Sequence, residues 1–364
     1  MKTGKAIPKY MELAKWIYGQ IQENDLRPGQ KLHSENELRE MFGVSRQTVR
    51  RALGLLEQEG ILRSVRGSGT YINDNRQINL ARKLRVSVVT TYVDGYIFPR
   101  MIQGIEHVLL ENGYSVQIAF TNNQHGRERT ILKDILNRDE VAGIVIETTK
   151  SALPNPNLHL YREIRERRMP ILFVNSFYPE LKIPHVSLND HMAGYRVTKY
   201  LIDRGHKKIA GIFKLDDLQG RLRCAGFMEA MYEAGLEVDD RRILWLDTED
   251  IRTMGKQAGR VIERSMGCTA MFCYNDEVAY GVIDIFKTIS VRVPQDISLV
   301  SVDNANLATL GEIGLTTVPH PMEQLGQKAS ENLLRMIHDP FFDANYEFDA
   351  EIVERDSVRQ QREA

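Results

Sequence analysis

The stretch MFGVSRQTVRRALGLLEQEG, residues 41–60, combines an apolar helical stripe with an exposed face rich in hydrogen-bond donors. Gln47, Arg50 and Arg51 fall on that exposed face, and no acidic residue accompanies them. An Arg can bond bidentately to guanine O6 and N7 and a Gln can bond to adenine, so this face is suited to reading base edges. The opposite, buried side is predicted to consist of Val49, Ala52, Leu53 and Leu56.

The elements around this stretch are those needed to present it. A first helix is predicted from about Pro8 to Glu23, and the spacing of Ser34 and Glu37 predicts a capping box that opens a second helix. Ser45 is expected to cap the third helix, after a turn at Gly43. Two short helices joined by such a turn form a helix-turn-helix, whose second helix enters the major groove. The alternative is a solvated, arginine-rich face without a partner.

Residues 61–72 predict a β-hairpin after the third helix, because two apolar runs flank the glycine-rich tip RGSG. Arg66 at this tip is placed to reach a minor groove, and the glycines allow the backbone a close approach to a duplex.

The segment PGQKLHSENELREMFGVSRQTVRRALGLLEQEGILRSVRGSGTYI resembles the winged helix-turn-helix of the GntR family of bacterial regulators, and the resemblance covers residues 8–72. It implies a chain that binds double-stranded DNA. The DNA contacts that it implies come from Lys9, Tyr10, Glu35, Ser45, Arg46, Gln47, Thr48, Arg50, Arg66 and Ser68.

Charge divides the chain in the same way. Residues 1–85 carry 16 Lys and Arg against 9 Asp and Glu, whereas the remaining residues carry 32 against 40. A folded basic end is suited to a polyanion. We expect a DNA-binding domain over 1–72, a polar linker over 73–83 and a large domain over 84–364.

Composition also bears on location and cofactors. The first residues lack the apolar core of a signal peptide and no apolar run reaches 18 residues, so we expect a cytoplasmic protein without a membrane partner. Cys268 and Cys273 have no nearby histidine, which argues against a zinc site, and Cys224 is the third cysteine. We expect no metal and no cofactor.

From Leu84 onward, strand-like apolar runs alternate with amphipathic helical segments about ten times. This predicts an α/β fold of doubly wound parallel sheets, divided into two lobes with a ligand cleft between them. Ligands of such sheets meet the carboxyl ends of the strands, and each polar residue there can alternatively be an ordinary helix cap or turn former. The residues at these ends are Tyr92, Asp94, Phe98, Glu147, Asn175, Asn275, Asp276 and Asp303, a set suited to a small polyhydroxylated ligand.

The segments HMAGYRVTKYLIDRGHKKIAGI, GRLRCAGFMEAM, AMFCYNDEVAYGVI and VPQDISLVSVDN resemble the effector domain of the LacI/GalR family, which is similar to periplasmic sugar-binding proteins. The resemblance covers residues 85–358 and implies ligand contacts from Arg223, Asn275 and Asp303. It further implies one from Asp190 or His191, and His191 can equally be a capping or packed residue. The GntR-type head replaces the hinge helix of that family, so a hinge-helix mechanism does not carry over.

A GntR head fused to a LacI-type sugar domain resembles the arabinose-responsive repressors of Firmicutes. The resemblance implies a homodimeric repressor of carbohydrate-utilisation genes that leaves its operator when a sugar, expected to be L-arabinose, binds between the lobes. The effector contacts expected are Tyr92, Phe98, Glu147, Asn175, His191, Arg223, Asn275 and Asp303. The alternatives are an activator, a sensor of another small sugar, a sugar-transport component, and a glycosidase using Glu147 and Asp303 as paired carboxylates.

Overall fold

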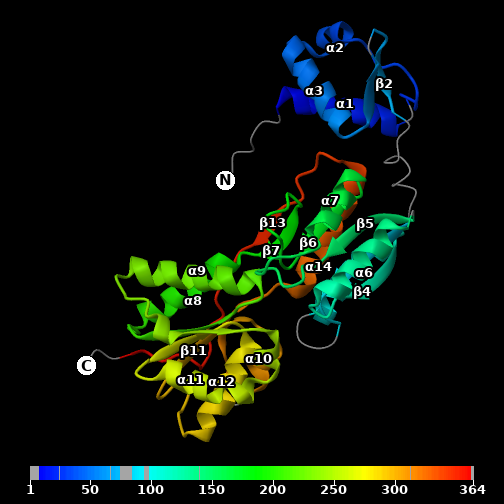
Figure 1. Cartoon of the computed structure of the whole chain (residues 1–364). Helices are drawn as coiled ribbons and strands as arrows, with labels where there is room; N and C mark the ends of the chain where they lie inside the picture. Colours follow the sequence, from blue (N-terminus) through cyan, green and yellow to red (C-terminus); the bar gives the residue numbers. More distant parts are fainter. Residues whose placement is uncertain are drawn as a thin grey trace.

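The computed structural model describes residues 8–23, 25–65, 67–73, 84–93, 98–138, 140–311 and 313–361. A small N-terminal domain, here called the head, stands above a two-lobed α/β body (Figure 1). The head consists of α1 (Lys9–Gln22), α2 (Glu35–Phe42), α3 (Arg46–Gln58) and the antiparallel strands β1 (Leu62–Val65) and β2 (Gly69–Ile72). The fold class expected from the sequence, a winged helix-turn-helix followed by two lobes of parallel sheet, is confirmed.

Local chemistry starts and stops the helices of the head. The Ser34 hydroxyl accepts from the Glu37 N–H while the Glu37 carboxylate accepts from the Ser34 N–H, which is the predicted capping box. Gly43 ends α2 in the left-handed conformation, with φ of 60°, where a residue without Cβ is favoured. The Ser45 hydroxyl then caps α3 by accepting from the Thr48 N–H at 3.1 Å.

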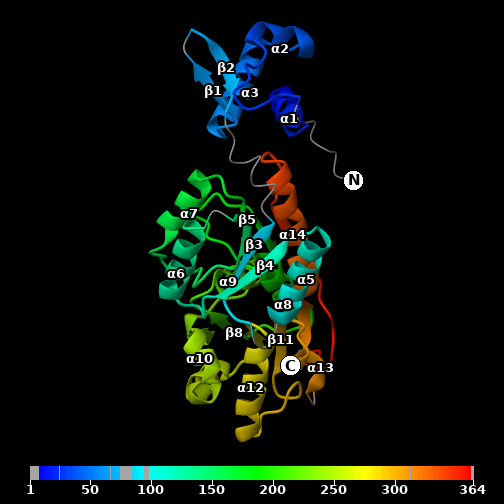
Figure 2. The ribbon, with the colours of Figure 1, turned by 90° about the vertical axis from the view of Figure 1, so that its right-hand side faces the viewer.

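The first lobe of the body, here called the N-lobe, holds a six-stranded parallel sheet with the order β13-β7-β6-β5-β3-β4. Its strands are β3 (Arg85–Thr90), β4 (Ser115–Phe120), β5 (Val141–Ile146), β6 (Ile171–Val174), β7 (His185–Leu188) and β13 (Tyr346–Phe348). Its helices are α5 (Phe98–Glu111), α6 (His125–Leu136), α7 (Leu158–Glu166) and α14 (Met322–His338). The helices α5 and α14 cover one face of the sheet, and α6 and α7 cover the other (Figure 2).

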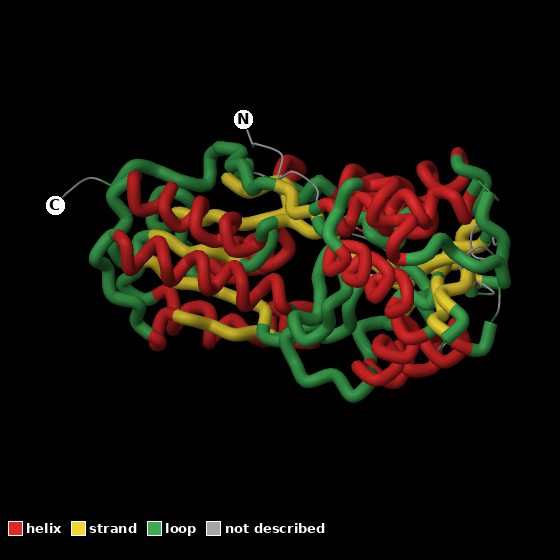
Figure 3. Tube along the Cα trace, turned by 90° about the horizontal axis from the view of Figure 1, so that it is seen from above, coloured by secondary structure: helices red, strands yellow, loops and turns green. Residues whose placement is uncertain are grey.

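The second lobe, the C-lobe, holds a five-stranded parallel sheet with the order β12-β11-β10-β8-β9. Its strands are β8 (Ile209–Lys214), β9 (Ile243–Leu246), β10 (Ala270–Cys273), β11 (Ser298–Asp303) and β12 (Thr316–Pro319). Its helices are α8 (Asp190–Asp203), α9 (Leu218–Glu233), α10 (Thr248–Arg252), α11 (Ala258–Ser265), α12 (Asp276–Thr288) and α13 (Leu307–Leu310). One core packs α8 and α9 on the sheet, and a second packs α11 and α12 on its other face; Figure 3 shows helices running alongside the strands.

The chain passes between the lobes after β7, after β12 and after β13. The carboxyl ends of both sheets face the boundary that these crossings span, so polar residues at strand ends of the two lobes meet there.

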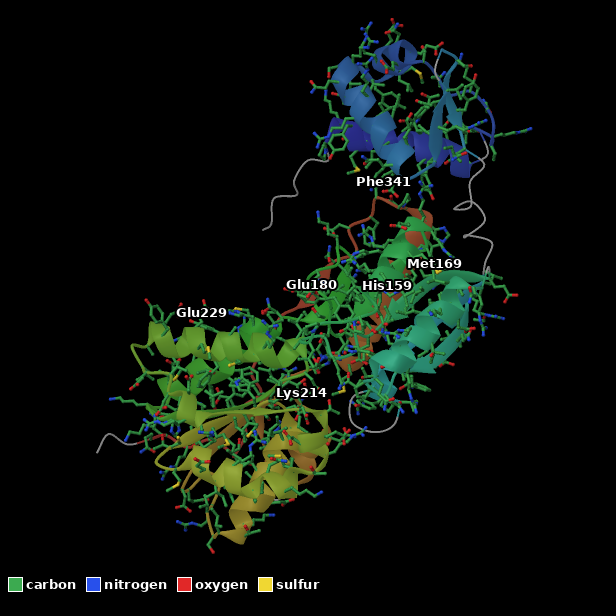
Figure 4. All side chains as sticks on the ribbon, viewed as in Figure 1. His159, Met169, Glu180, Lys214, Glu229 and Phe341 are labelled. Carbon is green, nitrogen blue, oxygen red and sulfur yellow. The ribbon has the colours of Figure 1, made fainter. Side chains whose placement is uncertain are left out.

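The head also touches the N-lobe directly. The Lys15 ammonium lies 2.8 Å from the Asp339 carboxylate, and the rings of Tyr18 and Phe341 meet edge to face with centroids 6.3 Å apart. Arg168 donates to the carbonyl of Gln58 at the carboxyl end of α3, at 3.1 Å. Phe341 lies on the side of the N-lobe that faces the head (Figure 4). No helix of the described residues is long and apolar enough to cross a membrane.

Candidate functional site

A cavity of about 440 Å³ lies between the two lobes. Its walls carry both charge signs, several side-chain amides and three aromatic rings. The lining residues are Thr91, Tyr92, Phe98, Asn123, Glu147, Thr148, Asn175, Lys214, Asp217, Gln219, Arg223, Thr248, Ile251, Arg252, Tyr274, Asn275, Glu277 and Asp303. The volume suits one small organic molecule, and the lining offers donors and acceptors from both lobes.

The N-lobe wall is organised around Glu147, which directly follows β5 and is only 4% exposed. One carboxylate oxygen accepts from the Thr91 N–H at 2.7 Å and from its hydroxyl at 2.6 Å, and the other accepts from the Asn175 amide at 2.7 Å. Burial raises the pKa of Glu147, while the Thr91 hydrogen bonds act in the opposite direction. Asn175 has a φ of 70°, a left-handed conformation that Asn tolerates, and its side chain lies beside Glu147.

The C-lobe wall is organised around Arg223, which is 1% exposed. Its guanidinium donates to Asp190 Oδ1 at 2.8 Å, to the carbonyl of Tyr274 at 2.7 Å and to Asp303 Oδ1 at 3.4 Å. Burial raises the pKa of Asp190 to about 6 despite the opposing effect of Arg223. Although burial opposes its charged form, the two carboxylates hold the pKa of Arg223 above its ordinary value. Arg223 therefore stays a cation in the wall of the cavity.

Close packing of α8 against α9 fixes the position of Arg223. A Cβ on Gly226 would lie 2.0 Å from the carbonyl oxygen of His191, and one on Gly194 would lie 2.1 Å from the carbonyl oxygen of Arg223. Only glycine at these two positions lets the helices approach so closely. The sequence motif GRLRCAGF thus contains both Arg223, which lines the cavity, and Gly226, which allows α9 to pack closely on α8.

Aromatic rings supply the apolar part of the cavity. Tyr92 and Phe98 meet edge to face with centroids 5.6 Å apart, and Arg252 lies 5.3 Å above the Tyr92 ring. The Tyr92 hydroxyl is buried and has no hydrogen-bond partner among the described residues. From the C-lobe, the Tyr274 ring lies 4.7 Å below the Arg223 guanidinium.

Lys214 and Asp217 are cavity residues that the sequence reasoning missed. The Lys214 ammonium donates to Asp217 Oδ2 at 3.2 Å, and Figure 4 shows Lys214 at the boundary between the lobes. Burial opposes the charged form of Lys214, but Asp217 and Asp216 raise its pKa overall. Their place along the chain was the available signal, because Lys214 is the last residue of the strand KIAGIFK and Asp217 follows that strand closely.

The structure gathers most of the expected effector residues into this cavity. Seven of the eight line it: Tyr92, Phe98, Glu147, Asn175, Arg223, Asn275 and Asp303. Asn275 also caps α12 by accepting from the Val278 N–H at 3.0 Å, so its ordinary capping role and its place in the wall coexist. Asp94 lies outside the described residues. Asp276 does not line the cavity; it accepts from the hydroxyls of Ser301 and Thr317.

His191 is the one effector residue that the structure places elsewhere. It does not line the cavity, and its ring nitrogen lies 2.9 Å from the Glu229 carboxylate of α9 on a partly exposed surface. The resemblance to the LacI/GalR effector domain had implied a contact from Asp190 or His191. Asp190 points toward Arg223, and one step along α8 points His191 toward Glu229 instead, so the packed role that the sequence left open for His191 is the one seen here.

In the head, Glu35 of α2 organises the arginines of α3. Its carboxylate accepts from Arg46 Nε at 2.9 Å and from Arg50 Nε at 3.1 Å. The hydrogen bond from Arg46 is the main cause that lowers the pKa of Glu35. Arg50 is exposed and its Nε is held by Glu35, whereas the Arg51 guanidinium lies 4.1 Å above the Tyr10 ring of α1.

The other residues expected to contact DNA belong to α1, to the start of α3 or to the wing of β1 and β2. Lys9, Gln47 and Ser68 are exposed, and the Ser68 hydroxyl lies 2.5 Å from that of Tyr71. Ser45 and Thr48 share a hydroxyl hydrogen bond of 2.8 Å at the start of α3. Arg66 lies outside the described residues. Among the described residues, no group of His, Cys, Asp and Glu is arranged to hold a metal ion.

Two family patterns match the chain. Residues 9–72 match "Bacterial regulatory proteins, gntR family", and residues 198–358 match "Periplasmic binding protein-like domain". The first pattern covers the head. The second covers most of the C-lobe together with α14 and β13 of the N-lobe.

Similar proteins are transcription regulators. The arabinose metabolism transcriptional repressor of Geobacillus stearothermophilus is 37% identical over 92% of this chain and 92% of its own length. The repressor of the same name from Halalkalibacterium halodurans is 36% identical over 90% of this chain and 89% of its own. Among solved structures, the transcription regulator CcpA of Lactococcus lactis aligns with a TM-score of 0.68 and 26% identity, over 76% of this chain and 100% of its own.

Proposed function

The chain belongs to the GntR-headed transcriptional repressors with a periplasmic-binding-protein-like domain, the family of the arabinose metabolism repressors, and on this premise we propose that L-arabinose releases it from its operator. It is a sugar-responsive DNA-binding repressor and not an enzyme. The proposal concerns the identity of the sugar, the residues that bind it and the assembly that carries the signal.

The observation that carries the proposal is the two-sided cavity. Glu147 and Asn175 reach it from the N-lobe, whereas Arg223, Asn275 and Asp303 reach it from the C-lobe. A pentose presents hydroxyls that both donate and accept and a C–H face that can pack on a ring, and the lining provides partners for each. The names of the two repressors described above favour arabinose over other pentoses.

In the head, we assign Gln47 and Arg50 to base edges and Lys9, Ser45, Arg46 and Thr48 to phosphates. Exposure of Gln47 and Arg50 on α3 supports the first assignment. The position of the others at the starts of α1 and α3, where backbone N–H groups also point outward, supports the second. Tyr10, Glu35, Arg66 and Ser68 remain proposed contacts of α1, α2 and the wing.

The proposed assembly is a cytoplasmic homodimer, with the head over 1–72, a linker over 73–83 and the effector domain over 84–364. Two heads would then meet two half-sites at a fixed helical spacing. A sugar that touches both lobes favours their closure, and the contacts of Lys15 and Tyr18 with the N-lobe offer a path from lobe to head besides the linker.

The test is titration of the purified full chain with L-arabinose, D-xylose, D-ribose, D-galactose and D-glucose by calorimetry, followed by operator binding with and without each sugar. We expect L-arabinose to bind with the highest affinity and to weaken operator binding by about 5- to 150-fold, with an equal reciprocal effect of DNA on the sugar. Preferential binding of another sugar, or an operator affinity that arabinose leaves unchanged, would overturn the assignment of the effector.

A further inference from the structure

The hydroxyl of Ser151 joins the two lobes beside the sugar cavity, behind the wall residue Asp217. Ser151 follows β5 in the N-lobe, is 6% exposed and does not line the cavity. Its Oγ donates to Asp217 Oδ1 at 2.9 Å and accepts from the N–H of Leu218 at 2.9 Å. Both of these partners belong to the C-lobe.

The position of this contact matters, because Leu218 is the first residue of α9. The first N–H groups of a helix have no partner inside the helix and are normally satisfied by the side chain of the capping residue. Asp217, which precedes α9, makes no such capping hydrogen bond. The hydroxyl of Ser151 takes that role from the other lobe, so the amino end of α9 is capped only while the lobes are together.

The hydroxyl is itself held in place. Ser176, which follows β6 in the N-lobe, donates to Ser151 Oγ at 2.9 Å. Asp217 is oriented from its other side by Lys214. A second hydrogen bond joins the lobes at the wall of the cavity, where the Asn123 amide of the N-lobe donates to Thr248 Oγ1 of the C-lobe at 2.9 Å.

We propose that Ser151 is a positioning residue that caps α9 across the cleft and so sets the affinity for every sugar that the closed cavity accepts, without selecting among them. The proposal rests on the proposed function. Its physical basis is that a ligand that touches both lobes binds the closed arrangement, so its apparent affinity scales with the population of that arrangement. A group that stabilises closure without touching the ligand changes all affinities by one factor.

The test uses the full-length chain and two variants. Ser151→Ala removes the bridging hydroxyl, and Ser187→Ala removes a hydroxyl that is also buried in the N-lobe, at 2% exposure, but has no hydrogen-bond partner among the described residues. The sugar panel is titrated by calorimetry, and small-angle X-ray scattering of each protein without sugar measures how far the lobes are open.

For Ser151→Ala we expect every measurable affinity to fall by about 5- to 30-fold, which corresponds to the loss of a capping hydrogen bond, with the ranking of the sugars unchanged. The radius of gyration of this variant without sugar should exceed that of the wild type. Ser187→Ala should match the wild type in both measurements.

Unchanged affinities in Ser151→Ala would overturn the proposal, as would a fall that differs from one sugar to the next, because that pattern indicates direct contact with the ligand. An equal fall in Ser187→Ala would attribute the effect to loss of any buried hydroxyl and would also overturn it. If the wild type binds none of the sugars, the proposed function fails, and the scattering comparison alone decides whether Ser151 holds the lobes together.

Discussion

Arg223 Nε and Asp190 Oδ1 lie 2.8 Å apart in a setting where neither side chain is more than 3% exposed. Removing one partner of such a pair leaves a buried charge without compensation, which typically costs about 3–5 kcal/mol. We therefore expect Arg223→Ala to lower the free energy of unfolding by that amount and to abolish sugar binding. Urea denaturation and calorimetry measure the two effects. Arg221→Ala, on the same helix but exposed, is the matched control and should change the stability by less than about 0.5 kcal/mol.

A substitution at Gly226 tests how closely α9 must pack on α8. A Cβ at this position would meet the carbonyl oxygen of His191 at 2.0 Å, so Gly226→Ala must push α8 and α9 apart. We expect a loss of about 1–3 kcal/mol in stability and weaker sugar binding, because Arg223 moves with its helix. Gly259→Ala in α11, where a new Cβ meets nothing within 4 Å, should instead be neutral or stabilising. A thermal melt of the two variants side by side gives the answer, and equal melting temperatures would contradict the packing argument.

His320 gives the protein an acid-sensitive element at the crossing between β12 and α14. Its Nε2 lies 2.8 Å from Asn175 Oδ1, and burial lowers its pKa to about 4. As pH falls below about 6.5, the unfolded chain takes up this proton first. The free energy of unfolding should therefore decrease by up to about 3 kcal/mol between pH 6.5 and 4.

The variant His320→Gln isolates this contribution, because its amide can still donate to Asn175 but cannot titrate. We expect the difference between wild type and variant to depend on pH over that window, as measured by urea denaturation at several pH values. His159→Gln on the exposed side of α7 (Figure 4) is the control and should follow the wild type. A pH-independent difference for His320→Gln would show that the ring is not kept neutral.

Substitutions at Arg50 and Lys9 should affect DNA binding differently, the first its sequence specificity and the second its overall affinity. Arg50→Ala is expected to reduce discrimination at one base pair of each half-site by about 1–3 kcal/mol, as for a bidentate contact to guanine. Lys9→Ala should weaken all sequences alike and reduce the salt dependence of binding. Binding curves on the operator and on single-base variants separate the two, and an unchanged sequence preference in Arg50→Ala would remove it from the base-reading surface.

Phe341 tests whether the contact between head and N-lobe carries the signal. Its ring packs on Tyr18 beside the ion pair of Lys15 and Asp339. Phe341→Ala should leave sugar affinity in the absence of DNA nearly intact but reduce the factor by which sugar weakens operator binding. Leu110→Ala, which truncates an apolar side chain that is 53% exposed on α5, is the control. Full coupling in Phe341→Ala would assign the signal to the linker.

The sequence by itself determined what short-range rules control. The boundaries of the helices in the head could be predicted from Ser34 with Glu37, from Gly43 and from Ser45. Capping acts within a few residues, and its geometry is the same in every fold. The residues at the strand ends of the large domain could also be predicted, from the order of strands and helices along the chain. In a parallel sheet the carboxyl ends of the strands meet at one edge, so Glu147 and Asn175 could be expected together in one lobe, and Asn275 and Asp303 in the other.

Only the tertiary structure decided which of these residues share a surface and what else joins them. The approach of α8 to α9 turned His191 toward Glu229, and the packing of α1 on α3 placed Arg51 over Tyr10. The role of Ser151 had no signal in the sequence, because its partners lie 66 and 67 residues further along the chain. Contacts at such separations depend on the relative placement of whole lobes, and no local propensity or periodicity carries that information.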